Sequence, residues 1–223
     1  MNYQKDKPII GVLGRIIDNK ITINNEIRYA IFKSGGIPTL LIPNNKSKDK
    51  KYINKLIDNI DGLIIPGGSI WYEFDEYAYK YALNKDIPIL GICMGMQMMC
   101  SVDLNNKKIK DMTVKNNTII NHKQNKKYVH KVKILDNTLL KSIIKRKKIK
   151  VNSRHSYHVE NVNKLKISAY SIDGLIEGVE YPNKKFVIGV EWHPESTFDS
   201  DIYSRRIFKK FIHECKRGKK RGL

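Results

Sequence analysis

Residues 87–95 read Ile-Pro-Ile-Leu-Gly-Ile-Cys-Met-Gly, an apolar run that enters a short turn containing two glycines. The run predicts a buried strand, and the apolar residues after it predict a helix. Glycines two positions before and two positions after Cys93 suit a sharp strand-to-helix turn, where the backbone is strained and its neighbours must be small. The stretch therefore predicts one strand–turn–helix unit of an α/β fold, with a thiol at the turn.

The first half of the chain repeats this alternation of strand and helix. Apolar runs of strand length occupy residues 8–13, 39–42 and 62–65, and helical periodicity marks residues 24–33, 49–57 and 73–83. Strands that alternate with helices imply a mostly parallel central sheet with helices on both faces.

The second half has a different pattern. Residues 105–127 are polar and rich in Lys and Asn, and we interpret them as an excursion from the domain. Strand-like runs follow at 129–135, 165–170, 175–181 and 186–190, and residues 200–215 predict a closing helix. Pro182-Asn183 predicts a turn that joins the last two strands in a hairpin. A small antiparallel extension of the sheet is expected here.

Cys93 is the candidate nucleophile. The predicted turn would place it at a helix N-terminus, whose dipole favours the thiolate, with the backbone N–H of Met94 facing a developing oxyanion. The alternative is a buried structural thiol, which is the usual role of a free cysteine. Cys100 and Cys215 lack such a setting, and we interpret both as inert.

His193 and Glu195 are the candidate base and its orienting carboxylate. They follow the apolar residues 187–190, and in extended chain they would project to the same side. One imidazole nitrogen could then bind the carboxylate while the other faces a thiol. The alternative is a surface histidine beside a solvated glutamate.

Gly67 and Gly68 end another apolar strand, after Pro66. A backbone N–H from this loop could face the oxyanion from the side opposite Met94. The alternative is an ordinary turn. A phosphate-binding loop is disfavoured because the characteristic Lys and Ser/Thr are missing.

Composition limits the class of protein. The chain has 223 residues and 41% hydrophobic content, which predicts a single globular domain over residues 1–223, with 217–223 as a disordered basic tail. No apolar run approaches the ~20 residues of a membrane span, and the N-terminus lacks the apolar core of a signal peptide, so we expect a cytoplasmic protein. Three scattered cysteines suit a reducing compartment, and without a Cys-x-x-Cys pair no metal site is predicted.

The formal net charge of +20 raises the question of nucleic acid. Lysine is spread along the whole chain, and it concentrates only at residues 145–148 and 216–221. Solvated surface is therefore the favoured interpretation of the charge over a nucleic-acid footprint.

Two of these segments resemble the signatures of class I glutamine amidotransferases. They are residues 91–97, with Cys93, and residues 189–195, with His193, and Pro66-Gly67-Gly68 matches the oxyanion loop of that family. Residues 151–155 and 173–180 resemble its γ-glutamyl-γ-aminobutyrate hydrolase branch. The resemblance extends from Pro8 to about Phe211.

The resemblance implies a flavodoxin-like α/β domain that needs no cofactor and cleaves a glutamyl amide with a Cys-His-Glu triad. By position, Gln97 would contact the bound glutamyl group. His155 would lie on the leaving-amine side, or would be a structural polar residue at a strand end.

The sequence departs from the branch at two places where the specificity for the leaving amine would be set. Ser156-Tyr157 stand where the branch commonly has His-Gln, and residues 100–105 replace a Gly-Gly-Thr-Leu stretch. The identity of the leaving amine therefore stays open.

Three functions compete at this point. The leading one is a hydrolase of small γ-glutamyl amides, and the second is a glutaminase component that passes ammonia to a separate synthase. The third is a non-enzymatic nucleic-acid-binding module, which the charge suggests. Such a module does not predict an intact triad, so it is the least favoured of the three. A small-molecule substrate is expected and a membrane is not, while a homodimer and a synthase subunit both remain open as partners.

Overall fold

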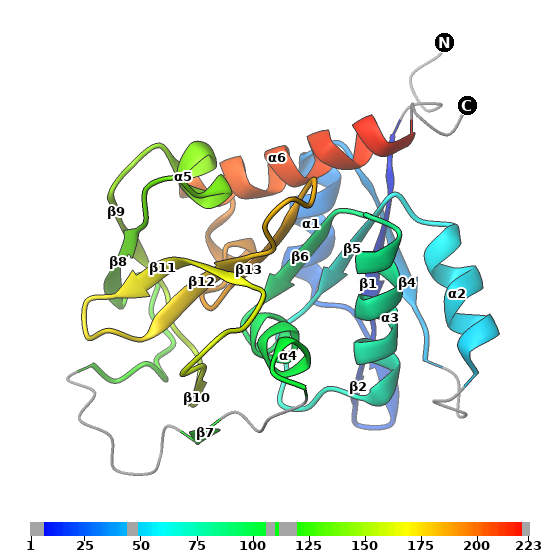
Figure 1. The fold of residues 1–223 in the computed structure, drawn as a ribbon, viewed down its shortest axis with the longest axis horizontal. Coiled ribbons are helices and arrows are strands. Elements are labelled where there is room, and N and C mark those ends of the chain that lie inside the picture. The colour runs from blue at the N-terminus through cyan, green and yellow to red at the C-terminus, as the bar shows by residue number, and fades with distance from the viewer. Residues whose placement is uncertain (1–6, 44–48, 106–109, 112–119, 220–223) are drawn as a thin grey trace.

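A mixed sheet forms the centre of the computed structural model, which describes residues 7–43, 49–105, 110–111 and 120–219 (Figure 1). Within these residues the sheet has nine strands, and five of them are parallel. In sheet order the parallel strands are β4 (Ile37–Leu41), β1 (Ile9–Leu13), β5 (Gly62–Ile65), β6 (Ile89–Ile92) and β13 (Val187–Val190).

The sheet continues beyond β13 with antiparallel strands. They are β12 (Ile176–Glu180), β11 (Lys166–Ser171), β8 (His130–Ile134) and β9 (Lys148–Val151). β12 and β13 form the predicted hairpin, with Tyr181 N donating to Val187 O across the turn. The antiparallel extension is therefore confirmed, and it has one strand more than expected, β9.

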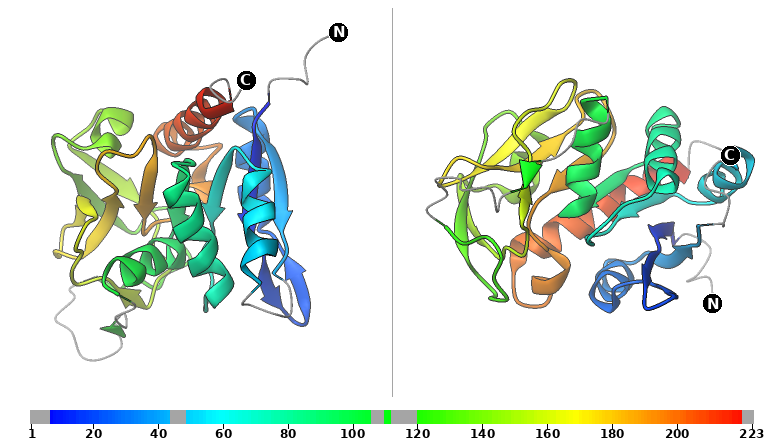
Figure 2. Two further views of the ribbon diagram at one scale, coloured as in Figure 1. Left: turned by 45° about the vertical axis from the view of Figure 1, so that its right-hand side comes forward. Right: turned by 90° about the horizontal axis from the view of Figure 1, so that it is seen from below.

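Helices cover both faces of the sheet (Figure 2). One face packs against α1 (Asn25–Lys33), α5 (Leu139–Ile144) and α6 (Ile202–Lys219), and the other against α2 (Lys50–Asp58), α3 (Glu73–Asn84) and α4 (Met94–Asp103). Two apolar cores result, one on each face. This arrangement confirms the predicted α/β class.

Local sequence explains where the helices begin. Asn24 caps α1 by accepting from Glu26 N at 2.7 Å, and Asp49 caps α2 by accepting from Tyr52 N at 3.0 Å. Each side chain satisfies a backbone N–H that has no partner inside its helix. Both caps are the residues at which the sequence predicts these helices to start.

Some elements differ from the prediction. The helix α5, the edge strand β9 and the hairpin of β2 (Arg15–Ile17) and β3 (Lys20–Thr22) were not expected. β9 begins inside the basic run 145–148, and its exposed lysines alternate with buried apolar residues, as suits a protected sheet edge.

Two expectations about termini and loops are also revised. α6 continues to Lys219, so Arg217 and Gly218 are helical, where a disordered tail was expected. Residues 220–223 lie outside the described residues, as does much of the predicted excursion at 105–127, where β7 (Lys110–Asp111) pairs with β10 (Tyr157–His158). Among the residues that the structure describes, no helix has the length and apolarity to cross a bilayer.

Candidate active site

The turn between β6 and α4 holds Cys93 in a strained conformation. Its φ is +51° and its ψ is −113°, a region that residues with a side chain seldom adopt. The turn is fixed to the neighbouring strand because Cys93 N donates to Val190 O at 2.8 Å. A side chain at Gly95 would place its Cβ 2.1 Å from Ile65 O, so this close approach requires glycine, as the sequence predicts.

His193 follows β13, the strand directly beside β6 and parallel to it. Parallel neighbours such as β6 and β13 end at the same edge of a sheet (Figure 1), so the residues that follow them, Cys93 and His193, are brought together. The imidazole lies near enough to the Cys93 thiol to lower the pKa of that thiol, and both side chains lie against Gly67. The predicted meeting of the thiol and the imidazole is thus present in the structure.

Glu195 contacts His193 by a different local geometry from the predicted one. His193 Nδ1 lies 2.7 Å from Glu195 Oε1, and the carboxylate is buried. The chain is not extended here, because Pro194 has helical φ and ψ and Glu195 opens a 3₁₀ turn, η1 (Glu195–Thr197). The predicted pair is therefore present, although the same-side argument from extended chain is wrong.

The protonation of the pair is set by burial and by the neighbouring charges. Burial raises the pKa of the Cys93 thiol above its ordinary value, and the hydrogen bonds from His193 and from Met94 N–H oppose this only in part. Burial alone would lower the pKa of His193, but Glu195 and Cys93 raise it well above 6.5. The pKa of Cys93 is therefore not lowered, contrary to the expectation from its position at a helix N-terminus.

The loop after β5 lies against this pair. A Cβ built at Gly67 would stand 2.9 Å from His193 Cε1 and 3.6 Å from the Cβ of Cys93. A Cβ at Gly68 would stand 3.4 Å from the sulfur of Met94. The three residues predicted as oxyanion donors are thus gathered around Cys93.

Arg15 holds this loop, and the sequence analysis did not single it out. Its Nη2 donates to Pro66 O at 3.2 Å, and its Nη1 donates to Asp75 Oδ2 at 2.9 Å. Both side chains are buried. The position of Arg15 in the sequence could have indicated this function. It is a charged residue just after an apolar strand, at the edge of the sheet where the other site residues lie.

Asn152 is a second residue whose function was missed. Its Oδ1 accepts from His193 N at 2.7 Å and its Nδ2 donates to His193 O at 2.8 Å. The side chain thereby fixes both backbone polar groups of the candidate base. Asn152 was noted only as part of residues 151–155, which resemble the hydrolase branch, and this contact was not predicted.

The side chains of Gln97 and His155 are more deeply buried than contact with a substrate alone would require. Both are buried, and Gln97 Nε2 donates to Tyr157 O at 3.1 Å and also to Glu191 Oε1. His155 Nδ1 lies 2.9 Å from Tyr157 O and 3.4 Å from Glu191 Oε1. Burial raises the pKa of Glu191 to about 7, although His155 opposes the rise.

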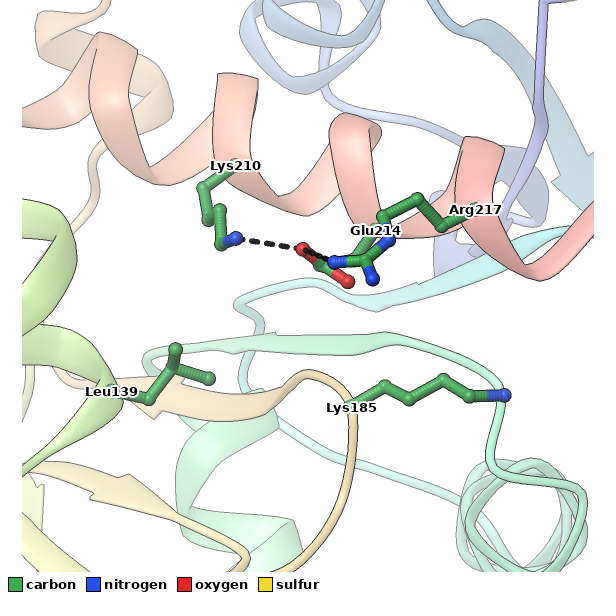
Figure 3. Close-up of a pocket in the computed structure, with 5 residues that line it drawn as sticks. All are labelled: Leu139, Lys185, Lys210, Glu214 and Arg217. Carbon is green, nitrogen blue, oxygen red and sulfur yellow. Dashed lines mark hydrogen bonds and ion pairs between the residues drawn. The ribbon is translucent and has the colours of Figure 1, made fainter.

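The other two thiols, Cys100 and Cys215, are buried in the apolar cores. A hollow of about 320 Å³ lies elsewhere, between α5, α6 and the β12–β13 turn (Figure 3). Lys210 and Arg217 converge there on Glu214, and Lys185 precedes β13. The hollow is therefore at the amino-terminal edge of the strands, opposite the edge that carries Cys93.

A model of the Peptidase C26 family matches residues 72–195, more than half of the chain. The chain belongs to that family. The matched region contains Cys93 and ends at Glu195, so it includes all three residues predicted as the triad.

Relatives agree over almost the whole length. The glutamine amidotransferase-like protein RP404 of Rickettsia prowazekii is 32% identical, with 95% of this chain and 99% of RP404 aligned. The γ-glutamyl-γ-aminobutyrate hydrolase PuuD of Escherichia coli is 25% identical over 94% of each chain. The CTP synthase of Sulfolobus acidocaldarius is 31% identical over 84% of this chain but only 41% of the synthase.

Solved structures support the fold. The glutaminase domain of the Trypanosoma brucei CTP synthase, with bound acivicin, superimposes with a TM-score of 0.66 at 17% identity, covering 95% of this chain and 94% of that one. The class I glutamine amidotransferase-like fold that the resemblance implies is thereby confirmed.

Proposed function

We propose that this protein hydrolyses the γ-glutamyl amide bond of glutamine or of a small γ-glutamyl amine. One observation carries the proposal: a strained Cys93 lies beside His193, and His193 Nδ1 lies 2.7 Å from the buried Glu195 carboxylate. A thiol, a base and an orienting group in this order are the parts of a covalent acyl-transfer site.

In the first half-reaction the sulfur of Cys93 attacks the γ-carbonyl carbon, and its proton passes to His193. The carbonyl oxygen gains the negative charge, which the N–H groups of Met94 and of the Gly67–Gly68 loop stabilise. The C–N bond then breaks, and His193 donates its proton to the leaving amine. A glutamyl thioester on Cys93 remains.

In the second half-reaction His193 removes a proton from water, and the resulting hydroxide attacks the thioester. The C–S bond breaks, glutamate leaves, and the proton returns to the sulfur. Glu195 holds the imidazole through Nδ1 in both steps, so that the other ring nitrogen faces the reacting atoms.

Gln97 and His155 have different parts in this proposal. Both amide hydrogens of Gln97 have protein acceptors, so its carbonyl oxygen is the group we assign to the glutamyl ammonium. His155 acts through Glu191 and the carbonyl of Tyr157, which orient Gln97. We assign His155 a positioning function on this basis.

The proposal is tested by a screen of γ-glutamyl amides, with free glutamine included, in which released glutamate and released amine are both measured. Hydrolysis of at least one compound by the chain alone is expected, with both products in equal amounts. The departures at Ser156-Tyr157 predict that the preferred amine differs from γ-aminobutyrate. Absence of hydrolysis across the whole set contradicts the stand-alone hydrolase.

A second candidate is a glutaminase component that delivers ammonia to a separate synthase. The likeness to less than half of a CTP synthase supports it, because this chain aligns with a part of that longer enzyme. In this case glutamine is the only substrate, and turnover is low until a partner is added. The same screen separates the two, since a stand-alone hydrolase accepts amides other than glutamine.

A further inference from the structure

Three histidines and one glutamate meet inside the antiparallel half of the sheet, apart from the triad. They come from four separate segments and are all buried: His122 before β8, His130 on β8, His155 after β9, and Glu177 on β12 (Figure 1). One potential ligand atom from each lies within 4.8 Å of every other. The cluster brings four segments of chain to one point.

The spacing of these atoms fits a small tetrahedral ion. His122 Nδ1 lies 3.6 Å from Glu177 Oε1. The Nε2 atoms of His130 and His155 lie 3.3 and 3.6 Å from the same oxygen. Ligands at about 2.0–2.1 Å from a tetrahedral zinc ion stand roughly 3.3 Å apart, so the three distances to Glu177 Oε1 need little adjustment. The nitrogen atoms lie within 4.8 Å of one another and would draw together around the ion.

His122 already has the partner that a metal-bound histidine requires. Its Nε2 lies 3.0 Å from Asp173 Oδ2, so that nitrogen carries the proton and donates it to the carboxylate. The Nδ1 atom, which faces Glu177, is then free of a proton, and the hydroxyl of Ser153 lies 3.2 Å from it. A carboxylate that holds the far nitrogen of a histidine is the usual outer contact of a zinc ligand.

His130 and His155 are oriented in the same way by backbone carbonyls. His130 Nδ1 lies 3.3 Å from Lys131 O, and His155 Nδ1 lies 2.9 Å from Tyr157 O. Each ring therefore directs its Nε2 atom toward Glu177. All three imidazoles thus have an acceptor on the far nitrogen, and in the neutral form each has a lone pair directed inward.

Apart from His122 Nδ1, the inward atoms lack partners outside the cluster. Within the described part of the chain, no hydrogen bond of ordinary geometry reaches the Nε2 atoms of His130 and His155 or either carboxylate oxygen of Glu177, although all are buried. Buried polar atoms are normally satisfied, and a set of them aimed at one point calls for an occupant. A divalent cation satisfies them together, and protons on His130 and His155 are the alternative occupant.

We propose that His122, His130, His155 and Glu177 bind one Zn²⁺ ion in a closed, four-coordinate structural site. Nitrogen ligands with a single carboxylate suit zinc, whereas Mg²⁺ and Ca²⁺ prefer oxygen. The ion ties β8 and β12 to the loops before β8 and after β9. His155 also contacts Glu191, which accepts a hydrogen bond from Gln97 on α4. The ion therefore stabilises the contacts that position Gln97 in the candidate active site. The inference does not depend on the proposed hydrolase activity.

The experiment uses the full chain without a histidine tag. The protein is stripped with a chelator and titrated with Zn²⁺ in competition with a chromogenic chelator, and thermal unfolding is followed in parallel. One Zn²⁺ per chain is expected, with a rise in Tm of about 5 °C or more at saturating metal. Co²⁺ should give the visible bands of a tetrahedral site without a sulfur charge-transfer band.

Matched variants locate the ion. Glu177→Gln and His130→Asn should lose the stoichiometric ion, and their Tm should no longer respond to zinc. Cys93→Ser and His213→Asn should retain it, because Cys93 is outside the cluster and His213 is exposed on α6. If the cluster variants fail to fold, the wild-type titration and the Co²⁺ spectrum still decide.

Two results overturn the proposal. The first is a wild-type chain that binds neither Zn²⁺ nor Co²⁺ on titration, which assigns the cluster to a proton-linked network. The second is binding that persists in Glu177→Gln and disappears in Cys93→Ser, which places the ion at the triad.

Discussion

Gly67 lies so close to His193 that a Cβ added to this glycine would stand 2.9 Å from Cε1 of the imidazole. Real Cβ atoms do not approach other atoms this closely. Any side chain at position 67 must therefore displace the loop or the candidate base. The contact links the predicted oxyanion loop directly to the triad.

Gly67→Ala is expected to lower kcat/KM by about 100-fold, the scale of losing one oxyanion donor, with little change in the fold. The reason is displacement of the loop N–H groups or of His193. Steady-state kinetics measure the effect, and circular dichroism checks the fold. Gly218→Ala is the matched control because nothing lies within 4 Å of its added Cβ. A Gly67→Ala enzyme with wild-type kinetics would remove this loop from the mechanism.

Alkylation of Cys93 is expected to accelerate about tenfold per pH unit between pH 7 and pH 9, since the thiolate is the reactive form. Burial raises the pKa of Cys93 above 9.0, so the thiolate fraction is still rising throughout this window. Cys93 should still be labelled before Cys100 and Cys215, whose pKa values burial raises further and which are fully buried. Mass spectrometry after iodoacetamide treatment measures both quantities.

A plateau of the rate below pH 8 would show a thiolate that is already formed, in conflict with the burial argument. Earlier labelling of Cys100 or Cys215 would be equally inconsistent. His193→Asn should slow the labelling at neutral pH, because His193 lowers the pKa of Cys93 in the native site.

His193→Asn is expected to reduce acylation by about 100-fold or more, the usual scale for a positioned base. Glu195→Gln should cost less, since an amide can still contact Nδ1 and the carboxylate acts through the imidazole. Pre-steady-state release of the amine measures acylation directly. His213→Asn serves as the control, and a loss in His193→Asn no larger than in Glu195→Gln would require another base.

Arg15→Gln is expected to lower the free energy of unfolding by about 3 kcal/mol, because Asp75 is left buried without its cation. Activity should fall as well, since the bond to Pro66 O that holds the oxyanion loop is lost. Adding Asp75→Asn should restore part of the stability but not the activity. Urea unfolding and kinetics of both variants separate the effects, and recovery of activity in the double variant would leave Arg15 with a structural function alone.

The parallel half of the fold could be predicted from the sequence because each strand there is a short apolar run between helical segments. β5 was predicted to the residue, and the helical segments were predicted to begin at Asn24 and Asp49, which are the caps of α1 and α2. The strand β9 was hidden because its alternating lysines lie within a basic run. Alternation indicates a strand with one exposed face, but the four residues of β9 are the shortest stretch over which it can be recognised.

The candidate site was predicted where its residues adjoin strand ends, and missed where they act on backbone groups far along the chain. Arg15 contacts a carbonyl at Pro66, and Asn152 contacts the backbone of His193. No local pattern reveals such contacts. The cluster around Glu177 was not predicted for the same reason, because its members are far apart in the sequence and include no cysteine.

The most direct test of the central claim compares wild-type protein, Cys93→Ala and Cys100→Ala on the best γ-glutamyl amide from the screen. Cys100 is a matched control because it is a buried thiol on the same helix as the turn that holds Cys93. Released glutamate and amine are measured together. We predict equal amounts of both from the wild-type and Cys100→Ala proteins and none from a folded Cys93→Ala. Undiminished turnover by Cys93→Ala would contradict the account.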